Sequence, residues 1–168
     1  MNTSSNNHSS TKNWHIAQWP PLAWAETVIK VIALTIAILG TIRALSAGAF
    51  AFPGGLRLAQ FIVQVILALG LVAAIFDRLI EREIIAMAFV ILNNLGHWGM
   101  ALALATTAGP GAHLSAFAAL MLLGDLVKLV FLRVHDFRVR DTPPAAMYGL
   151  TLFYVAGYAV LLILQAIS

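Results

Sequence analysis

The feature that most limits the fold of this chain is a series of five apolar runs, each about as long as a membrane-spanning helix. A helix needs about 20 predominantly apolar residues to cross a bilayer, and in lipid its backbone polar groups must be paired within the helix. The runs cover approximately residues 22–45, 58–76, 84–105, 114–132 and 145–167. The sequence therefore predicts an all-α fold, a polytopic integral membrane bundle of five transmembrane helices.

Glycine and proline separate several of these runs, which gives the boundaries a physical cause because both residues interrupt helices. The connections include SAGAFAFPGG at 46–55, TTAGPGAH at 106–113 and VHDFRVRDTPP at 134–144. The break at 106–113 has the weakest signal, since no charged residue occurs between Glu83 and Asp125. One unbroken helix across it would far exceed the bilayer, so we expect a turn there.

Composition excludes a water-soluble domain. Hydrophobic residues make up 61% of the 168 residues and charged residues 10%, whereas soluble domains have about 45–50% and about 25%. The net charge of +3 does not indicate a nucleic-acid partner, because the basic residues lie mostly at the edges of the apolar runs. The lipid bilayer is the expected partner, and a homo-oligomer or a larger membrane complex is left open.

The composition along the chain also predicts where the membrane domain begins and ends. Residues 1–13 are polar and low in complexity, which predicts a disordered tail, and residues 14–168 are expected to form a single five-helix domain. Ala47-Gly48-Ala49 resembles a signal-peptidase site. The apolar stretch before it is longer than a signal peptide needs, so we expect a retained first helix.

Seven polar residues within the runs are the candidates for a site, because polar groups are costly inside a membrane. They are Glu26, Lys30, Asn93, Asn94, His97, Asp125 and Lys128. At about 1.5 Å per residue, Lys30, the asparagines and Asp125 lie roughly 12–15 Å from the predicted cytoplasmic ends of their helices. Matched depth on three helices predicts one polar layer.

The simplest arrangement of this layer is an ion pair between Lys30 and Asp125, to which an asparagine donates a further hydrogen bond. Glu26 and Lys128 are spaced to meet Lys30 and Asp125 along their own helices. The favoured interpretation of such a network is that it only fixes helix packing, and the alternative is a binding or proton-handling site open to the cytoplasm. In a third interpretation, Lys30 and Lys128 extend to the membrane surface.

His97 lies one turn beyond the asparagines, in NNLGHWG. A bis-histidine haem needs a second intramembrane histidine on another helix, and the other histidines lie outside the predicted spans. One histidine and one aspartate are too few for a metal site. We therefore predict no cofactor and no metal, and we expect His97 to hydrogen-bond to a neighbouring helix. A titrating histidine in a proton path is the alternative.

No catalytic motif is present: the sequence has no Walker loop, nucleophile elbow, zinc-protease motif or cysteine. We predict no catalytic residue, and an enzyme is the least favoured class. The favoured function is a multi-pass membrane protein that binds a small molecule, lipid or ion, or serves as a subunit of a membrane assembly. The alternative is a carrier or channel with a cytoplasm-facing polar path through the layer of Lys30, Asn93, Asn94 and Asp125.

Orientation follows from the positive-inside rule. One side would carry Lys12, Arg78, Arg82, Arg133, Arg138 and Arg140, and the other Arg43 and Arg57. This asymmetry predicts a cell-membrane protein with a cytoplasmic N-terminus and an external C-terminus.

Cysteine labelling tests this topology, because the chain has no cysteine of its own. Single cysteines at Ser5, His113 and Ser168 are treated with an impermeant thiol reagent outside intact cells. We expect labelling at 113 and 168, and at 5 only after the membrane is permeabilised. Labelling at 5 without labelling at 168 would reverse the orientation.

Overall fold

The computed structural model describes residues 19–80, 84–135 and 144–168, and in these ranges it contains five helices. The helices are α1 (Pro21–Ala47), α2 (Gly55–Ile80), α3 (Ile84–Leu104), α4 (Ala112–Val134) and α5 (Pro144–Ala166). All five are long and apolar enough to span a membrane, which confirms the predicted fold class. The predicted disordered tail at 1–13, and parts of the predicted cytoplasmic connections at 81–83 and 136–143, lie outside the described residues.

The helix ends follow the backbone preferences of the residues beside them. Pro21 occupies the first turn of α1, where its missing N–H is not needed. Gly55, Gly109 and Gly111 have φ between +56° and +63°, a conformation that glycine adopts without steric cost. The turn predicted at 106–113 is therefore present. α2 extends about one turn beyond the predicted span at each end.

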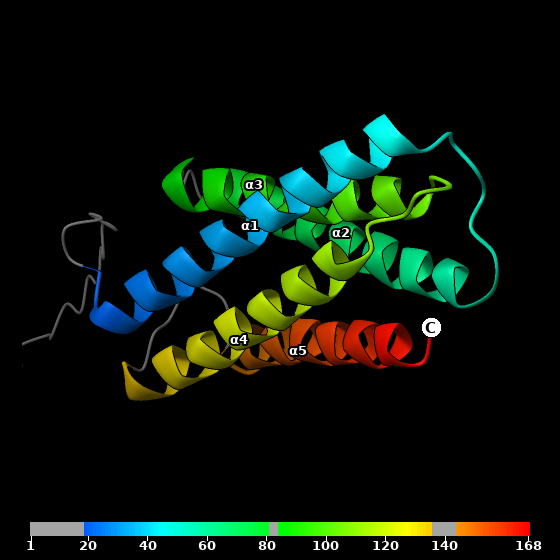
Figure 1. Ribbon diagram of the computed structural model, residues 1–168. Helices are drawn as coiled ribbons and strands as arrows, with labels where there is room; N and C mark the ends of the chain where they lie inside the picture. The colour runs from blue at the N-terminus through cyan, green and yellow to red at the C-terminus, as the bar shows by residue number, and fades with distance from the viewer. Residues whose placement is uncertain (1–18, 81–83, 136–143) are drawn as a thin grey trace, which may run out of the picture.

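The helices form a ring in the order α1, α4, α5, α2 and α3, in which each packs against two neighbours. The contact between α1 and α4 is the most extensive, and that between α2 and α5 is the sparsest of the five. Figure 1 shows α1 lying beside both α3 and α4. A ring places one side of every helix against a common central axis, so inward-facing side chains of all five helices can meet there.

The two ends of the ring differ. At the end that we call proximal, α1, α3 and α5 begin and α2 and α4 end; the opposite, distal end carries the α1–α2 and α3–α4 connections and the C-terminus (Figure 1). The distal connections pair through backbone hydrogen bonds from Ala51 N to Ala105 O (3.0 Å) and from Thr107 N to Ala49 O (2.8 Å). Arg57 also donates a hydrogen bond to Thr106 O (2.9 Å). These bonds fasten the distal connections to each other.

The distal half of the ring is filled with apolar side chains. Met100, Leu104, Leu114 and Leu161 are almost fully buried there. Large apolar side chains on the outer faces, such as Ile38, Leu69 and Leu95, are at least half exposed, as expected for residues that face lipid. Packing therefore closes the distal half and leaves the proximal half as the place for a site.

Substituting two helical glycines separates the effect of packing on stability from the effect of helix propensity. A methyl group on Gly40 would lie 2.6 Å from Cβ of His113, whereas nothing lies within 4 Å of one on Gly149. Both alanines gain about 1 kcal/mol of helix propensity, but Gly40→Ala also overpacks the α1–α4 contact at a cost of about 1–3 kcal/mol. We expect Gly40→Ala to melt at a lower temperature in detergent than Gly149→Ala. Equal melting temperatures would show that α1 and α4 do not pack this closely.

Candidate binding pocket and polar network

A pocket of about 260 Å³ lies inside the proximal half of the ring, and all five helices contribute to its wall. Most of the wall is apolar. Its apolar side chains include Leu71 of α2, Phe89 and Val90 of α3, and Phe131 and Leu132 of α4. Close to the start of α1, the ring of Trp19 lies 5.8 Å from that of Phe89. The pocket thus has an aromatic and aliphatic wall near the proximal end.

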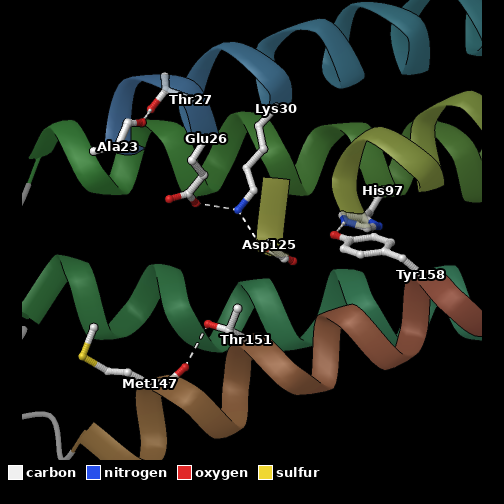
Figure 2. Close-up of polar contacts among 9 residues, drawn as sticks. All are labelled: Ala23, Glu26, Thr27, Lys30, His97, Asp125, Met147, Thr151 and Tyr158. Carbon is white, nitrogen blue, oxygen red and sulfur yellow. Dashed lines mark hydrogen bonds and ion pairs between the residues drawn. The ribbon is translucent and has the colours of Figure 1, made fainter. Parts of the chain in front are cut away.

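One part of the pocket wall is charged. Lys30 Nζ donates hydrogen bonds to Glu26 Oε1 (2.7 Å) and to Asp125 Oδ1 (2.6 Å), as Figure 2 shows. Glu26 precedes Lys30 by one turn of α1, and Asp125 comes from α4. The ion pair expected between Lys30 and Asp125 is therefore present, with Glu26 as a second carboxylate. Because these charges face a low-dielectric interior, the bonds hold α1 firmly against α4.

A glycine allows α4 to approach the lysine. A methyl group on Gly124 would lie 3.1 Å from Cγ of Lys30, closer than most side chains tolerate. Gly124 immediately precedes Asp125 in the chain. The missing side chain therefore leaves room for the lysine stem beside the carboxylate that binds its ammonium group.

The other members of the predicted layer take different positions. Lys128 and Asn93 line the same pocket, and the charge of Lys128 acts on Glu26. Asn94 is 8% exposed, and its side-chain oxygen has no hydrogen-bond partner among the described residues. Neither asparagine bonds to Lys30 or Asp125 in the described ranges, so that expectation is wrong. Glu26 supplies the second partner of Lys30 instead, from one turn away on the same helix.

His97 belongs to a separate, deeper cluster. Its Nδ1 lies 2.7 Å from Gln64 Oε1 and its Nε2 lies 2.9 Å from the Tyr158 hydroxyl. Because the glutamine oxygen carries no hydrogen, Nδ1 donates and the tyrosine hydroxyl donates to Nε2. The rings of His97 and Tyr158 stack at 5.6 Å (Figure 2). The expectation that His97 bonds to neighbouring helices is confirmed, with partners on α2 and α5.

Several residues of these clusters were not among the seven candidates predicted for the polar layer. Gln60 and Gln64 occur in the second apolar run, and Tyr154 and Tyr158 in the fifth. All four are buried, and Tyr154 donates a hydrogen bond to Leu67 O (3.0 Å). Their spacing of four residues within each helix was the available signal, because it places each pair on one helix face.

The chemistry available at the pocket is that of charged and hydrogen-bonding groups. Within the described ranges, no three histidine, aspartate or glutamate side chains converge as a metal-ion site requires. Lys30 uses two of its three hydrogens in the ion pairs, which leaves one N–H donor, and each carboxylate has a second oxygen that can accept hydrogen bonds. Comparison of the chain with protein-family models, with curated proteins and with solved structures gives no match.

The ion network makes a prediction about stability. Lys30→Leu leaves two carboxylates without their shared ammonium group, and Asp125→Leu leaves Lys30 with Glu26. Removing one partner of a buried pair costs about 3–5 kcal/mol, so we expect Lys30→Leu to be the more destabilising change. Melting temperatures in detergent measure the loss of stability in both variants.

The double variant distinguishes an ion pair from two independent contacts. With both Lys30 and Asp125 replaced by leucine, only Glu26 remains of the three bonded charges, and Lys128 lies near it. We expect the double variant to be more stable than Lys30→Leu alone. Strictly additive losses would contradict coupling between the two side chains.

Proposed function

We propose that this protein is a cell-membrane receptor or binding protein for a small molecule, with a polar head group and an apolar body, that occupies the proximal pocket. The observation that carries the proposal is the combination, within a single cavity, of the charged Glu26–Lys30–Asp125 cluster with an aromatic and aliphatic wall. Ligand pockets are mostly apolar with a few placed polar groups that fix orientation.

The size and charge of the pocket narrow the ligand. Its volume of about 260 Å³ is slightly below the range of about 300–1,000 Å³ that holds drug-sized molecules. The pocket wall contains four charged side chains whose formal charges sum to zero, namely Glu26, Lys30, Asp125 and Lys128. A small uncharged or zwitterionic head group that both donates and accepts hydrogen bonds suits this wall without leaving a charge unpaired.

The proposed ligand enters from the cytoplasmic side. Support comes from the position of the lining residues, since Trp19, Leu132 and Met147 lie at or near the proximal helix ends. The asymmetry of lysine and arginine favours a cytoplasmic proximal end, in the plasma membrane of the cell. The distal connections, fastened by the hydrogen bonds of Ala51 and Thr107, are then external.

A carrier is the second candidate. A polar layer that served only to pack the helices would be fully paired and would leave no cavity, whereas a pocket lies beside these charged side chains. In that proposal, the proximal pocket is the substrate site of a state open to the cytoplasm. The apolar distal packing of Leu104, Leu114 and Leu161 would be the closed side. Transport would require these side chains to separate in a second state.

Two neighbouring alanines of α2 provide a test of binding. Ala74 lines the pocket, whereas Ala73 is exposed on the outer face. We expect Ala74→Phe to fill the pocket and to abolish copurification of a small molecule that native mass spectrometry detects with the wild-type protein. Ala73→Phe adds the same ring to the same helix on the lipid side and should retain the molecule. Retention by Ala74→Phe, or no bound molecule in the wild type, would overturn the proposal.

A further inference from the structure

The packing of α1 against α3 changes along the two helices. A methyl group on Gly99 would lie 2.7 Å from Oγ1 of Thr41, and one on Gly96 would lie 3.3 Å from a leucine methyl group of α1. Glycine lets helices in a membrane approach this closely. About one and two turns nearer the proximal end, the same face of α3 carries Leu92 and Phe89. Large side chains replace glycine there, and Figure 1 shows the proximal ends of the two helices apart.

The pocket reaches the lipid-facing surface in this region. Its described wall contains four exposed residues, Val31, Phe89, Leu92 and Leu150. Val31 of α1 is 48% exposed and Leu92 of α3 is 45% exposed. Leu150 of α5 has no such counterpart, because none of the described lining residues of α2 and α4, its neighbours in the ring, is exposed. Exposed lining residues on both sides of one helix contact indicate a lateral opening, which we call the α1–α3 opening.

The residues at the α1–α3 opening select against charge on a ligand. A molecule that enters between Val31 and Leu92 passes apolar side chains before it reaches the Lys30 cluster. An ionised group is far more costly to move through such a region than a hydroxyl group is. A zwitterionic head group would carry two charges along this route. The opening therefore favours an uncharged head group.

Hydroxyl groups also match the charged wall of the pocket. Lys30 has one N–H donor beyond its two ion pairs, and Glu26 and Asp125 each have a second oxygen that can accept a hydrogen bond. A hydroxyl group can donate to a carboxylate and accept from an ammonium group at the same time. Hydrogen bonds to ionised partners are stronger than those between neutral groups. A head group with two hydroxyls can thus bond to both signs of charge.

The volume of the pocket limits how much of a ligand it contains. About 260 Å³ is slightly less than the range of about 300–1,000 Å³ for drug-sized ligands. This space suits a small head group and the first part of an apolar chain. The rest of a long chain would extend through the α1–α3 opening, where the surrounding hydrocarbon receives it without cost.

We propose that the ligand of the pocket is a single-chain lipid with an uncharged dihydroxy head group, a monoacylglycerol or a lipid of that chemistry. It enters through the α1–α3 opening from the leaflet at the proximal end. Its hydroxyls bond to Glu26, Lys30 and Asp125, and its chain passes Val31 and Leu92 into the bilayer. The inference rests on the proposed function, to which it adds the class of ligand and the route of entry.

Photolabelling in liposomes tests the class of ligand. The full-length protein is reconstituted in phosphatidylcholine with a monoacylglycerol that carries a diazirine in its chain, and intact-mass spectrometry measures the adduct after irradiation. We expect excess monooleoylglycerol to remove most of the labelling. Methyl oleate has the chain without the hydroxyls, glycerol has the hydroxyls without the chain, and lysophosphatidylcholine has a zwitterionic head group. None of these three should compete.

Matched tryptophan substitutions test the route. Val31→Trp and Leu92→Trp place a large ring at the α1–α3 opening and should abolish the labelling that monooleoylglycerol removes. Val28→Trp and Leu95→Trp place the same ring on the same two helices, at residues that are 53% and 58% exposed and do not line the pocket. Both should be labelled like the wild type. Melting temperatures in detergent establish which variants are folded, and the competitors decide the test if the two opening variants are not.

The contrary outcomes are distinct. Labelling that methyl oleate or lysophosphatidylcholine also removes, or that monooleoylglycerol does not remove, would overturn the class of ligand. Competition by glycerol would indicate a water-soluble ligand with the same hydroxyl chemistry and would overturn the lipid. Competed labelling that persists in folded Val31→Trp and Leu92→Trp would overturn the route. If the wild type retains a molecule other than a lipid and Ala74→Phe loses it, this inference fails while the proposed function stands; if the wild type binds no molecule, the proposed function itself fails.

Discussion

The pairing of Lys30 with two carboxylates is the interaction on which the arrangement of helices most depends. Hydrocarbon offers no water to a buried ammonium group, so an isolated charge at this depth would cost several kcal/mol. Glu26 lies on the same helix as Lys30 and imposes no tertiary constraint, but Asp125 can reach Lys30 only if α1 packs against α4. These two helices make the most extensive contact in the ring. The need to pair the charge of Lys30 therefore helps to determine that α1 and α4 are neighbours.

The arrangement of a ring, rather than a solid bundle, explains why a pocket exists at all. Five helices around one axis leave a central space that side chains must fill. Large side chains such as Phe117 and Met100 fill it in the middle and distal half. In the proximal half, Lys30 is held at the wall by its bonds to Glu26 and Asp125. A side chain committed to an ion pair cannot also fill the axis, so a cavity remains beside it.

The number of helices and the central ion pair could be predicted from the sequence, and the reasons are physical. Bilayer thickness fixes helix length, and few charges lie at matched depth, so Lys30 had few partners available. The end of α2 was less predictable because hydropathy marks the membrane, whereas backbone hydrogen bonds continue the helix through the charged residues that follow Phe76. The pocket depends on which helices adjoin and on the summed side-chain volumes of all five. A single sequence does not specify those quantities.

The partners of His97 could not be predicted for a related reason. Depth along a helix can be counted from the chain, but the rotation of each helix about its axis cannot. Gln64 and Tyr158 bond to His97 only because α2 and α5 turn those side chains toward the axis. Uncharged polar residues also give a weak signal, since they are tolerated at many helix contacts in membranes and each contributes only about 0.6–2 kcal/mol. The rotation of α3 about its axis, which the sequence does not give, also decided that neither asparagine bonds to the ion pair.

The distribution of polar groups along the axis follows from the cost of charge. The ionised side chains of the pocket wall lie in the proximal half, where Lys30 and Glu26 retain 19% and 18% exposure of their side chains. The sealed middle contains only neutral groups in His97, Tyr158 and Gln64, whose burial requires hydrogen bonds but no counter-ion. A resting chain of neutral groups can therefore extend where a permanent charge cannot. A permanent charge in this region would meet the same desolvation cost that confines Lys30 to the pocket.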